Sequence, residues 1–282
     1  MNRLINIRIR GKHGKPILTD IFFKASGKPK PVVIFAHGFK GFKDWGHFNL
    51  IAERFAEEGF VFVKFNFSHN GTTPGHPADF ADLEAFGSNN FSIEMDDLGC
   101  VIDFMLNESE PLQSGDADAE KLFLVGHSRG GGVVILKANE DARVEKIVTW
   151  AVVNDFGKQW SQEVMDDWKK KGVVYIENAR THQQMPLYYQ FAENYFANKD
   201  RLHIPTAVKN IKIPFLIIHG TDDEAVPYQS AVTMHGWNPA SELLPVDGGN
   251  HVFGAKHPYE RTRLPEDAEK VVGKTISFLL NG

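Results

Sequence analysis

The sequence predicts an α/β fold with a mostly parallel, twisted sheet, an antiparallel N-terminal hairpin and helices on both faces. Apolar runs of strand length alternate with amphipathic stretches of helical length along the 282-residue chain. Most of these runs are continuously apolar, which is typical of strands that are buried on both faces of a parallel sheet. The first two runs differ, because LINIRIR alternates with period two and a short turn joins it to ILTDIFFKA. They predict an antiparallel hairpin with one solvated face.

The remaining elements follow in regular order. The buried strand VVIFAHG precedes a helix from Asp44 to Gly59, and the strand FVFVKFNF comes next. The helix is expected because apolar side chains recur at helical spacing and a glycine ends the pattern. The alternation of helices and strands continues through SIEMDDLGCVIDFMLNE, KLFLVGH, RGGGVVILKANE, VEKIVTWAVV, PFLIIHG, YQSAVTMHGW, SELLPVDG and AEKVVGKTISFLL.

Two long stretches interrupt this alternation. Residues 68–91 form a polar connection, and residues 154–212 hold helical pieces, among them PLYYQFAENYFANKD, with VVYIE as the one sheet-like run. Long insertions in compact α/β domains usually serve as lids or binding loops. We therefore expect a core domain of residues 1–153 and 213–282, with residues 154–212 as a cap or lid over the strand ends. An appendage that packs elsewhere is the alternative.

Composition and charge are those of an ordinary globular protein, with 42% hydrophobic residues, 24% charged residues and a net charge of -5. Acidic and basic residues are interspersed, which gives no support for a nucleic acid or a membrane as a partner. The sequence has neither a signal-peptide pattern nor an apolar run long enough for a bilayer, and its single cysteine, Cys100, excludes an intrachain disulfide. We expect a cytoplasmic protein with a small-molecule partner, and a homodimer stays open.

One serine stands at a junction between a predicted strand and a predicted helix. Ser128 lies two residues from Gly126 and two from Gly130, with LFLV before this cluster and GVVILKA after it. This is the G-x-S-x-G nucleophile elbow, in which a sharp, strained turn projects the serine hydroxyl from the sheet edge. A glycine-rich turn of a nucleotide-binding fold is the alternative, but the chain contains neither G-x-G-x-x-G nor G-x-x-x-x-G-K-[ST].

A serine nucleophile needs a general base, and the base needs an acid to orient it. His251 in GGNHVFG follows the last predicted strand and is the candidate base. The acid should come from the turn after PFLIIHG, where Asp222, Asp223 and Glu224 stand together. We favour Asp223, with Asp222 second and Glu224 third. The chain order Ser128, Asp223, His251 is that of α/β-hydrolases and not that of chymotrypsin or subtilisin.

The chemistry also requires an oxyanion hole. The backbone N–H of Arg129, the residue after the nucleophile, is one expected donor. The second is expected in the loop after VVIFAHG, where the N–H of Phe39 is the candidate. Such a donor is typically worth about 3 kcal/mol of the activation barrier. We expect the Arg129 side chain to form only a surface contact, and His127 and His219 to make local hydrogen bonds.

With these parts in place, nearly the whole chain resembles the α/β-hydrolase superfamily. HGFKGFKDW resembles the oxyanion loop of bacterial cinnamoyl and feruloyl esterases. HGTDDEAVP and GGNHVF resemble the acid and histidine turns of that group, and those of dienelactone-hydrolase and prolyl-oligopeptidase-like hydrolases. The resemblance implies Ser128 as nucleophile, Asp223 as acid and His251 as base. A serine at the elbow argues against dienelactone hydrolase and haloalkane dehalogenase activity, because those enzymes carry cysteine and aspartate there.

These features predict a serine hydrolase that cleaves carboxylic esters through an acyl-enzyme, with no metal and no organic cofactor. His69 and His76 lack a third metal ligand at a usable spacing. Aromatic or short-chain acyl esters are candidate substrates because residues 154–212 are rich in aromatic side chains, although these rings can equally form the core of the insertion. A small peptidase or amidase of the acylaminoacyl-peptidase type and a non-catalytic ligand-binding protein are the alternatives.

Overall fold

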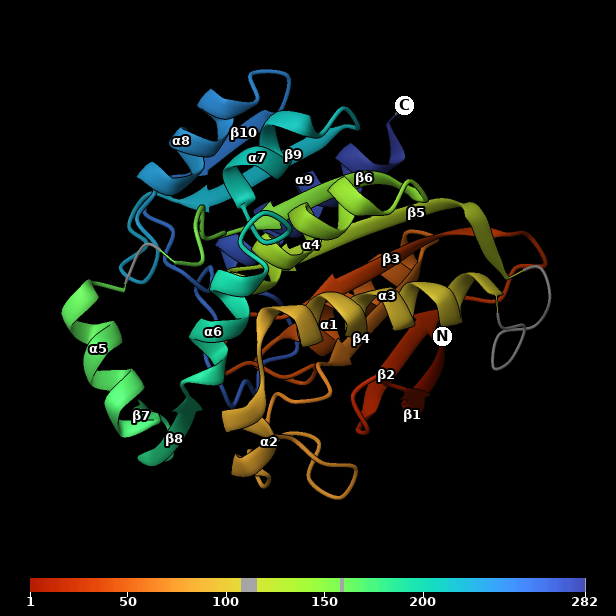
Figure 1. Cartoon of the computed structure of the whole chain (residues 1–282). Coiled ribbons are helices and arrows are strands. Elements are labelled where there is room, and N and C mark those ends of the chain that lie inside the picture. The colour runs from red at the N-terminus through yellow and green to blue at the C-terminus, as the bar shows by residue number, and fades with distance from the viewer. Residues whose placement is uncertain (108–115, 158–159, 282) are drawn as a thin grey trace.

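The computed structural model describes residues 1–107, 116–157 and 160–281 of the chain. Its large sheet contains β1 (Asn2–Arg10), β2 (Pro16–Phe23), β3 (Lys30–Ala36), β4 (Val61–Asn66), β5 (Ala117–His127), β6 (Val144–Trp150), β9 (Phe215–Gly220) and β10 (Glu242–Val246). These strands lie in the order β1-β2-β4-β3-β5-β6-β9-β10 (Figure 1). β2 pairs antiparallel with β1 and with β4, and the remaining pairs are parallel. The predicted fold class is confirmed.

Helices cover both faces of this sheet. α1 (Phe48–Glu57) and α9 (Glu266–Leu280) pack against one apolar cluster, and α3 (Phe91–Asn107), α4 (Arg129–Glu140) and α8 (Gln229–Trp237) pack against the other. Along β3, Val33 and Phe35 belong to the first cluster, whereas Val32 and Ile34 belong to the second. Successive side chains of a strand point to opposite faces, so a strand covered on both sides must be apolar throughout.

The two edges of the large sheet are short or irregular. In β1 the register shifts between Leu4 and Ile7, and Asn6 within this bulge has a φ of 56°. β10 has five residues and contains Pro245. The prediction that one face of the hairpin is solvated was wrong for β2, in which every residue except the first is buried. The reason is that β2 contributes Phe22 to the apolar cluster beneath α1, and Ile17 and Ile21 to the cluster on the opposite face.

The helix expected from Asp44 begins only at Phe48. Gly46 has a φ of 55°, a left-handed conformation that an α-helix cannot contain. The Asp44 carboxylate accepts hydrogen bonds from two lysines. Trp45, the first apolar residue of the predicted helical pattern, therefore belongs to the loop that precedes the helix.

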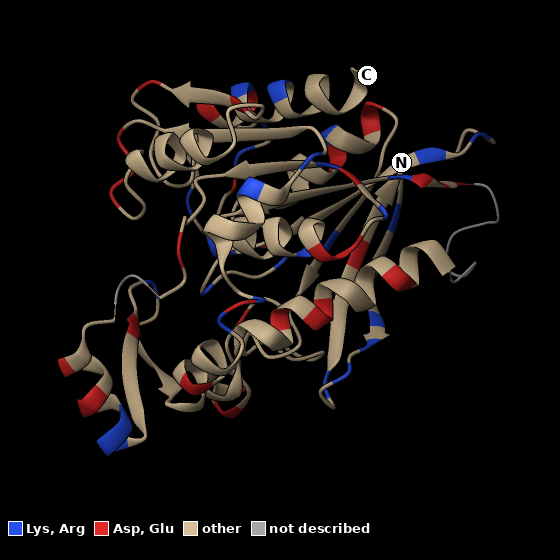
Figure 2. Ribbon diagram, turned by 45° about the horizontal axis from the view of Figure 1, so that its top comes forward, with Lys and Arg blue, Asp and Glu red and all other residues tan. Residues whose placement is uncertain are grey.

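The insertion, residues 154–212, contains α5 (Gln162–Lys171), β7 (Val173–Asn178), β8 (Gln183–Tyr188), α6 (Gln190–Ala197) and α7 (Ile204–Asn210). α5, β7 and β8 project away from the large sheet (Figure 1), while α7 packs back against α4 and α8. α5 carries acidic residues near its start and lysines at its end (Figure 2), an arrangement that suits the helix dipole. No helix in the described part of the chain is both long and apolar enough to cross a bilayer.

β8 is an element that the sequence analysis missed. We expected a helix from Pro186 onward, but Pro186 faces Tyr175 in the antiparallel β7-β8 pair, and α6 starts only at Gln190. β8 also contacts α2 (Leu83–Ser88), which lies in the connection of residues 68–91. The Tyr188 hydroxyl donates to Glu84 Oε2 at 2.6 Å. The insertion is thus joined to the earlier connection.

Most aromatic side chains of the insertion pack against one another and join the apolar cluster of the core domain. Trp168, Phe191 and Tyr195 are buried, and the half-buried Trp160 packs against all three at ring distances of 5.4 to 5.9 Å. Tyr175 and Phe196 are exposed instead. These rings therefore pack both among themselves and against α3, where Phe191 lies 4.7 Å from Phe91 between ring centres.

Candidate active site

Ser128 stands between β5 and α4 in a conformation that is rare for a residue with a side chain. Its φ is 55° and its ψ is -120°. Its backbone N–H donates to the Trp150 carbonyl of β6 at 2.8 Å, which ties the turn to the neighbouring strand. Residues held at positive φ by their surroundings concentrate at functional sites.

Three glycines allow this turn to lie against the loop of residues 37–46, which follows β3. A Cβ on Gly126 would collide with the Gly130 carbonyl oxygen. A Cβ on Gly130 would collide with the Ala36 carbonyl oxygen and lie 2.5 Å from that of His37. On the loop side, a Cβ on Gly38 would lie 3.0 Å from the Ser128 Cβ. The loop backbone therefore passes directly beside the serine.

His251 and Asp223 come together from the turns after β10 and β9. His251 Nδ1 lies 2.8 Å from Asp223 Oδ2. Of the three acidic residues in this turn, Asp223 is buried, whereas Asp222 and Glu224 are exposed. The structure thus pairs the histidine with the first of the three sequence candidates.

The Asp223 carboxylate is held in its ionised form. Burial alone would raise its pKa, but hydrogen bonds from His219, His251 and the Val226 N–H hold the pKa well below its usual range. Asp223 Oδ1 accepts the N–H groups of Ala225 at 2.9 Å and Val226 at 2.8 Å. Its second oxygen therefore stays available to His251.

His219 is a site residue whose role the sequence analysis did not anticipate, although it did expect a local hydrogen bond. It is fully buried, and its Nε2 lies 2.8 Å from the Val226 carbonyl oxygen and 3.2 Å from Asp223 Oδ2. One ring nitrogen thus faces both the acid and the turn that holds the acid. The sequence signal was the short spacing between His219 and Asp223.

Two further histidines lie beside Ser128 without carrying charge at neutral pH. Burial lowers the pKa of His127 to about 3 and that of His37 to about 4. His127 Nε2 lies 2.8 Å from the His251 carbonyl oxygen, and the two rings are 4.8 Å apart. His127 therefore fixes the backbone of the candidate base. Among the hydrogen bonds of the described residues, none joins Ser128 Oγ to the His251 ring.

The expected oxyanion donors lie on either side of the serine. Arg129 is the first residue of α4, where a backbone N–H has no partner within its own helix. Phe39 is in the loop that Gly38 brings against Ser128. Within the ranges that the structure describes, neither the Phe39 N–H nor the Arg129 N–H donates to another protein group.

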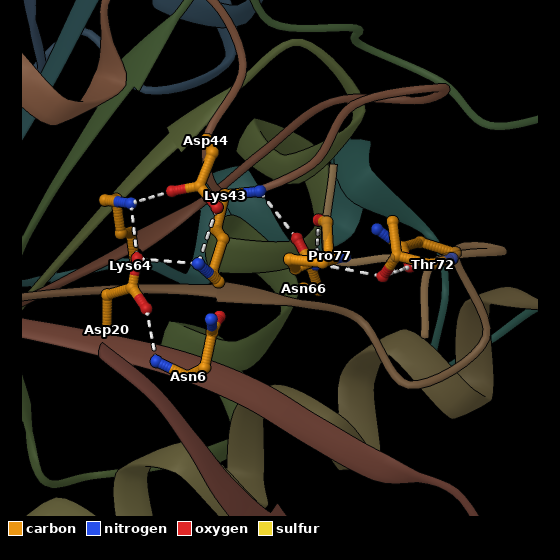
Figure 3. A network of polar contacts seen from close by, with 9 residues as sticks. Asn6, Asp20, Lys43, Asp44, Lys64, Asn66, Thr72 and Pro77 are labelled. Atoms are coloured by element: carbon orange, nitrogen blue, oxygen red, sulfur yellow. Dashed lines mark hydrogen bonds and ion pairs between the residues drawn. The ribbon is translucent and has the colours of Figure 1, made fainter. Parts of the chain in front are cut away.

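A buried ionic network anchors this loop to the sheet (Figure 3). Lys43 Nζ lies 2.7 Å from Asp20 Oδ2 and 2.6 Å from Asp44 Oδ2. Lys64 Nζ lies 2.7 Å from Asp20 Oδ2 and 2.6 Å from Asp44 Oδ1. The side chains of Lys43, Lys64 and Asp20 are at most 1% exposed. Asp44 is 23% exposed and supplies the second anion, so two cations and two anions neutralise one another, as the burial of the other three side chains requires.

A second set of hydrogen bonds extends the network along the loop. Asn66 Oδ1 accepts the Lys43 N–H at 2.6 Å, and Asn66 Nδ2 donates to Thr72 Oγ1 at 2.9 Å (Figure 3). Thr72 Oγ1 donates to Asn70 Oδ1 at 2.7 Å, and Asn70 Nδ2 donates to the Gly41 carbonyl at 3.2 Å. Residues 37–46 are therefore anchored at Gly41, Lys43 and Asp44.

The Arg129 side chain is not a surface contact, and that expectation was wrong. Only 10% of the side chain is exposed, and it forms two hydrogen bonds to Glu94, from Nε at 3.1 Å and from Nη2 at 2.6 Å. Its guanidinium carbon lies 4.8 Å from the ring centres of Phe39 and Phe91, and 4.9 Å from that of Phe191. The burial arises because the loop of residues 37–46, α3 and α6 meet over the start of α4.

A protein-family model described as BD-FAE matches residues 19–237. The chain belongs to the BD-FAE family. This match and the fold confirm the resemblance to the α/β-hydrolase superfamily.

Solved structures share the fold of this BD-FAE family member at low sequence identity. Est1E from Butyrivibrio proteoclasticus with bound ferulic acid is 18% identical, with a TM-score of 0.71 over 97% of this chain and 98% of that one. DcsB in complex with its substrate analogue is 16% identical, with a TM-score of 0.73 over 99% of both chains. The Paleococcus ferrophilus monoacylglycerol lipase is 17% identical, with a TM-score of 0.65 over 93% of this chain and 98% of that one.

None of the curated proteins matches the sequence of this BD-FAE family member. The esterase and the lipase among the structural neighbours share the α/β-hydrolase fold of this chain.

Proposed function

We propose that this BD-FAE family member is a serine hydrolase that cleaves carboxylic esters, with Ser128 as nucleophile, His251 as general base and Asp223 as the acid that orients the base. The observation that carries the proposal is the 2.8 Å pairing of His251 Nδ1 with Asp223 Oδ2 near a serine held at a φ of 55°. With its Nδ1–H donated to the carboxylate, the imidazole has a free Nε2 that can accept the proton of the serine hydroxyl.

In the first half of the proposed reaction, Ser128 Oγ attacks the ester carbonyl carbon and its proton passes to His251 Nε2. The negative charge that develops on the carbonyl oxygen is stabilised by the backbone N–H groups of Phe39 and Arg129. The intermediate then breaks its bond to the alcohol oxygen, which takes the proton from His251 as it leaves.

In the second half, water attacks the acyl-enzyme while His251 again accepts a proton. The bond to Ser128 Oγ breaks, the carboxylic acid is released and the serine hydroxyl is restored.

For the substrate we propose a small-molecule ester with an aromatic or short acyl group, bound under a cap formed by the insertion. Lys40 of the loop beside Ser128 donates to the Glu177 carbonyl of β7 at 3.0 Å, which supports a cap that lies over the site. Est1E, which shares the fold, was solved with ferulic acid bound. The cytoplasmic location and the homodimer stay predictions.

Labelling of the active serine tests the proposal. A fluorophosphonate probe should label the wild-type protein and Ser26→Ala, because Ser26 is exposed in the turn before β3, at the opposite end of the parallel strands from Ser128. Ser128→Ala should not be labelled and should lose hydrolysis of p-nitrophenyl esters. Wild-type protein that is never labelled and hydrolyses no ester would refute the proposal.

A substrate panel then separates ester hydrolysis from amide hydrolysis. The panel contains p-nitrophenyl esters of increasing chain length, methyl ferulate and an aminoacyl arylamide. We expect the highest kcat/KM for an ester with a short or aromatic acyl group. A higher kcat/KM for the arylamide than for every ester would replace the esterase assignment by the amidase alternative.

A further inference from the structure

The guanidinium of Arg129 is the point where four segments meet beside Ser128. Glu94 and Phe91 come from α3, Phe39 comes from the loop of residues 37–46, and Phe191 comes from α6 of the insertion. Planar guanidinium groups stack on aromatic faces and bind carboxylates through two parallel hydrogen bonds, which an ammonium cannot do. This geometry is therefore specific to arginine.

Neighbouring residues bury the Arg129–Glu94 ion pair and add a further hydrogen bond to its carboxylate. The Glu94 side chain is 6% exposed, and its Oε1 also accepts a hydrogen bond from Asn89 Nδ2 at 2.8 Å. A buried pair of this kind contributes little net stability compared with apolar residues of the same volume. A role in fixing one arrangement of the surrounding segments gives a reason for keeping the pair at this place.

Arg129 is connected to both proposed oxyanion donors. Its own backbone N–H is one of them, and its side chain contacts the ring of Phe39, whose backbone N–H is the other. The remaining contacts of the guanidinium extend this connection to α3 and to the insertion. Movement of the guanidinium would thus displace the Phe39 ring relative to the start of α4.

We infer that Arg129 is a positioning residue, whose side chain sets the distance between the Phe39 and Arg129 N–H groups and ties the oxyanion hole to α6 of the insertion. The inference rests on the proposed function of Ser128. Donors act on the transition state only when they are held at the place where the oxyanion forms. Loss of the guanidinium should therefore reduce kcat and leave KM nearly unchanged, because the ester carbonyl in the ground state uses these donors less.

The decisive variant is the double replacement Arg129→Met with Glu94→Gln. It removes the guanidinium without leaving a buried carboxylate that lacks a partner, so the fold should be retained. A misplacement of about 1 Å can cost about a hundredfold in rate, so we expect kcat for p-nitrophenyl acetate to fall between tenfold and a hundredfold. KM should stay within threefold of wild type.

Arg129→Lys and Arg143→Met complete the comparison. Lysine keeps a cation beside Glu94 but loses the planar stacking, so its kcat should lie between those of wild type and the double variant. Arg143 lies just before β6 and pairs with Asp103 and Asp141. It stands at the start of the parallel strands, whereas Ser128 stands at their ends, so Arg143→Met should match wild-type kcat.

The second measurement is the inhibition constant of phenylboronic acid, which forms a tetrahedral adduct on an active serine. This constant should rise by about the same factor as kcat falls, a change that a loss of fold stability alone would not produce. A folded double variant with kcat and inhibition constant within twofold of wild type would overturn the inference. So would a rise in KM at unchanged kcat. Wild-type protein that neither reacts with the fluorophosphonate nor hydrolyses the ester would instead overturn the proposed function.

Discussion

Replacing Lys64 by methionine should strongly destabilise the protein, because the change leaves the buried network with one cation and two anions. Lys64 is fully buried and lies 2.7 Å from Asp20 and 2.6 Å from Asp44. After the change, only Lys43 remains to neutralise both carboxylates. Breaking a buried ion pair by removing one partner typically costs about 3–5 kcal/mol of folding free energy.

The magnitude translates into a measurable shift in the melting temperature. At about 2.1 cal/mol/K per residue, a chain of 282 residues unfolds with an entropy of about 0.6 kcal/mol/K. A loss of 3–5 kcal/mol therefore lowers Tm by about 5–8 °C. Removing one anion as well restores neutrality, so Lys64→Met combined with Asp44→Asn should be more stable than Lys64→Met alone.

Thermal unfolding followed by circular dichroism, with urea titrations at 25 °C, measures the full cycle of Lys64→Met, Asp44→Asn and the double variant. The coupling between the two changes should be positive for stability, because the second change relieves the charge that the first one exposed. A double variant that is as unstable as the sum of the two single changes would refute this account. It would mean that the four side chains do not act as one neutral unit.

Three further predictions concern the site itself. Gly38→Ala should lower kcat at least tenfold, because its Cβ would lie 3.0 Å from the Ser128 Cβ, whereas Gly236→Ala has nothing within 4 Å and should leave esterase kinetics unchanged. Asp223→Asn should reduce kcat by roughly 10³ to 10⁴, measured with p-nitrophenyl acetate, because the amide does not hold His251 in the required tautomer; a loss below tenfold would contradict its role. Burial lowers the His127 pKa to about 3, so the folded protein resists protonation of this ring. The free energy of unfolding therefore decreases as the pH falls below about 6.5, the pKa of histidine in the unfolded chain. Between pH 6.5 and 5, the free energy of unfolding measured with urea should decrease by about 2 kcal/mol less in His127→Gln than in the wild type. An identical pH dependence in the two proteins would contradict the burial of an uncharged His127.

The order of strands and helices could be predicted because it depends on local periodicity. β3 is apolar from Val32 to Ala36 since helices cover both of its faces, and this pattern is visible in a single segment. The pairing of His251 with Asp223 followed from the rule that the ends of parallel strands meet at one edge of the sheet. The position of Ser128 followed from the glycines that its turn requires.

The surroundings of Arg129 could not be predicted in this way. Phe39, Phe91 and Phe191 come from three distant segments, and no local pattern records that they meet. β8 was missed because Pro186 is unfavourable in most strands, and only an edge position in a two-stranded sheet accommodates it.

The ionic network did leave a signal in the sequence. Lys64 interrupts the apolar run of β4 and Asp20 interrupts that of β2, and the two residues face each other in the β2-β4 register. A charge inside an apolar strand is costly unless a partner neutralises it. Opposite charges at such positions in two runs therefore indicate that the strands are neighbours.

The two edges of the large sheet have a consequence for self-association. Unpaired strand edges can recruit a strand from another molecule, which leads to aggregation. Here the bulge at Asn6 interrupts hydrogen-bonding geometry along β1, whose exposed edge also carries arginines, and Pro245 removes a donor from the short β10. Neither end of the sheet is a template for adding another strand. A dimer of this chain would have to bury helices or loops, and partly unfolded molecules would lack a ready seed for fibrils in these two strands.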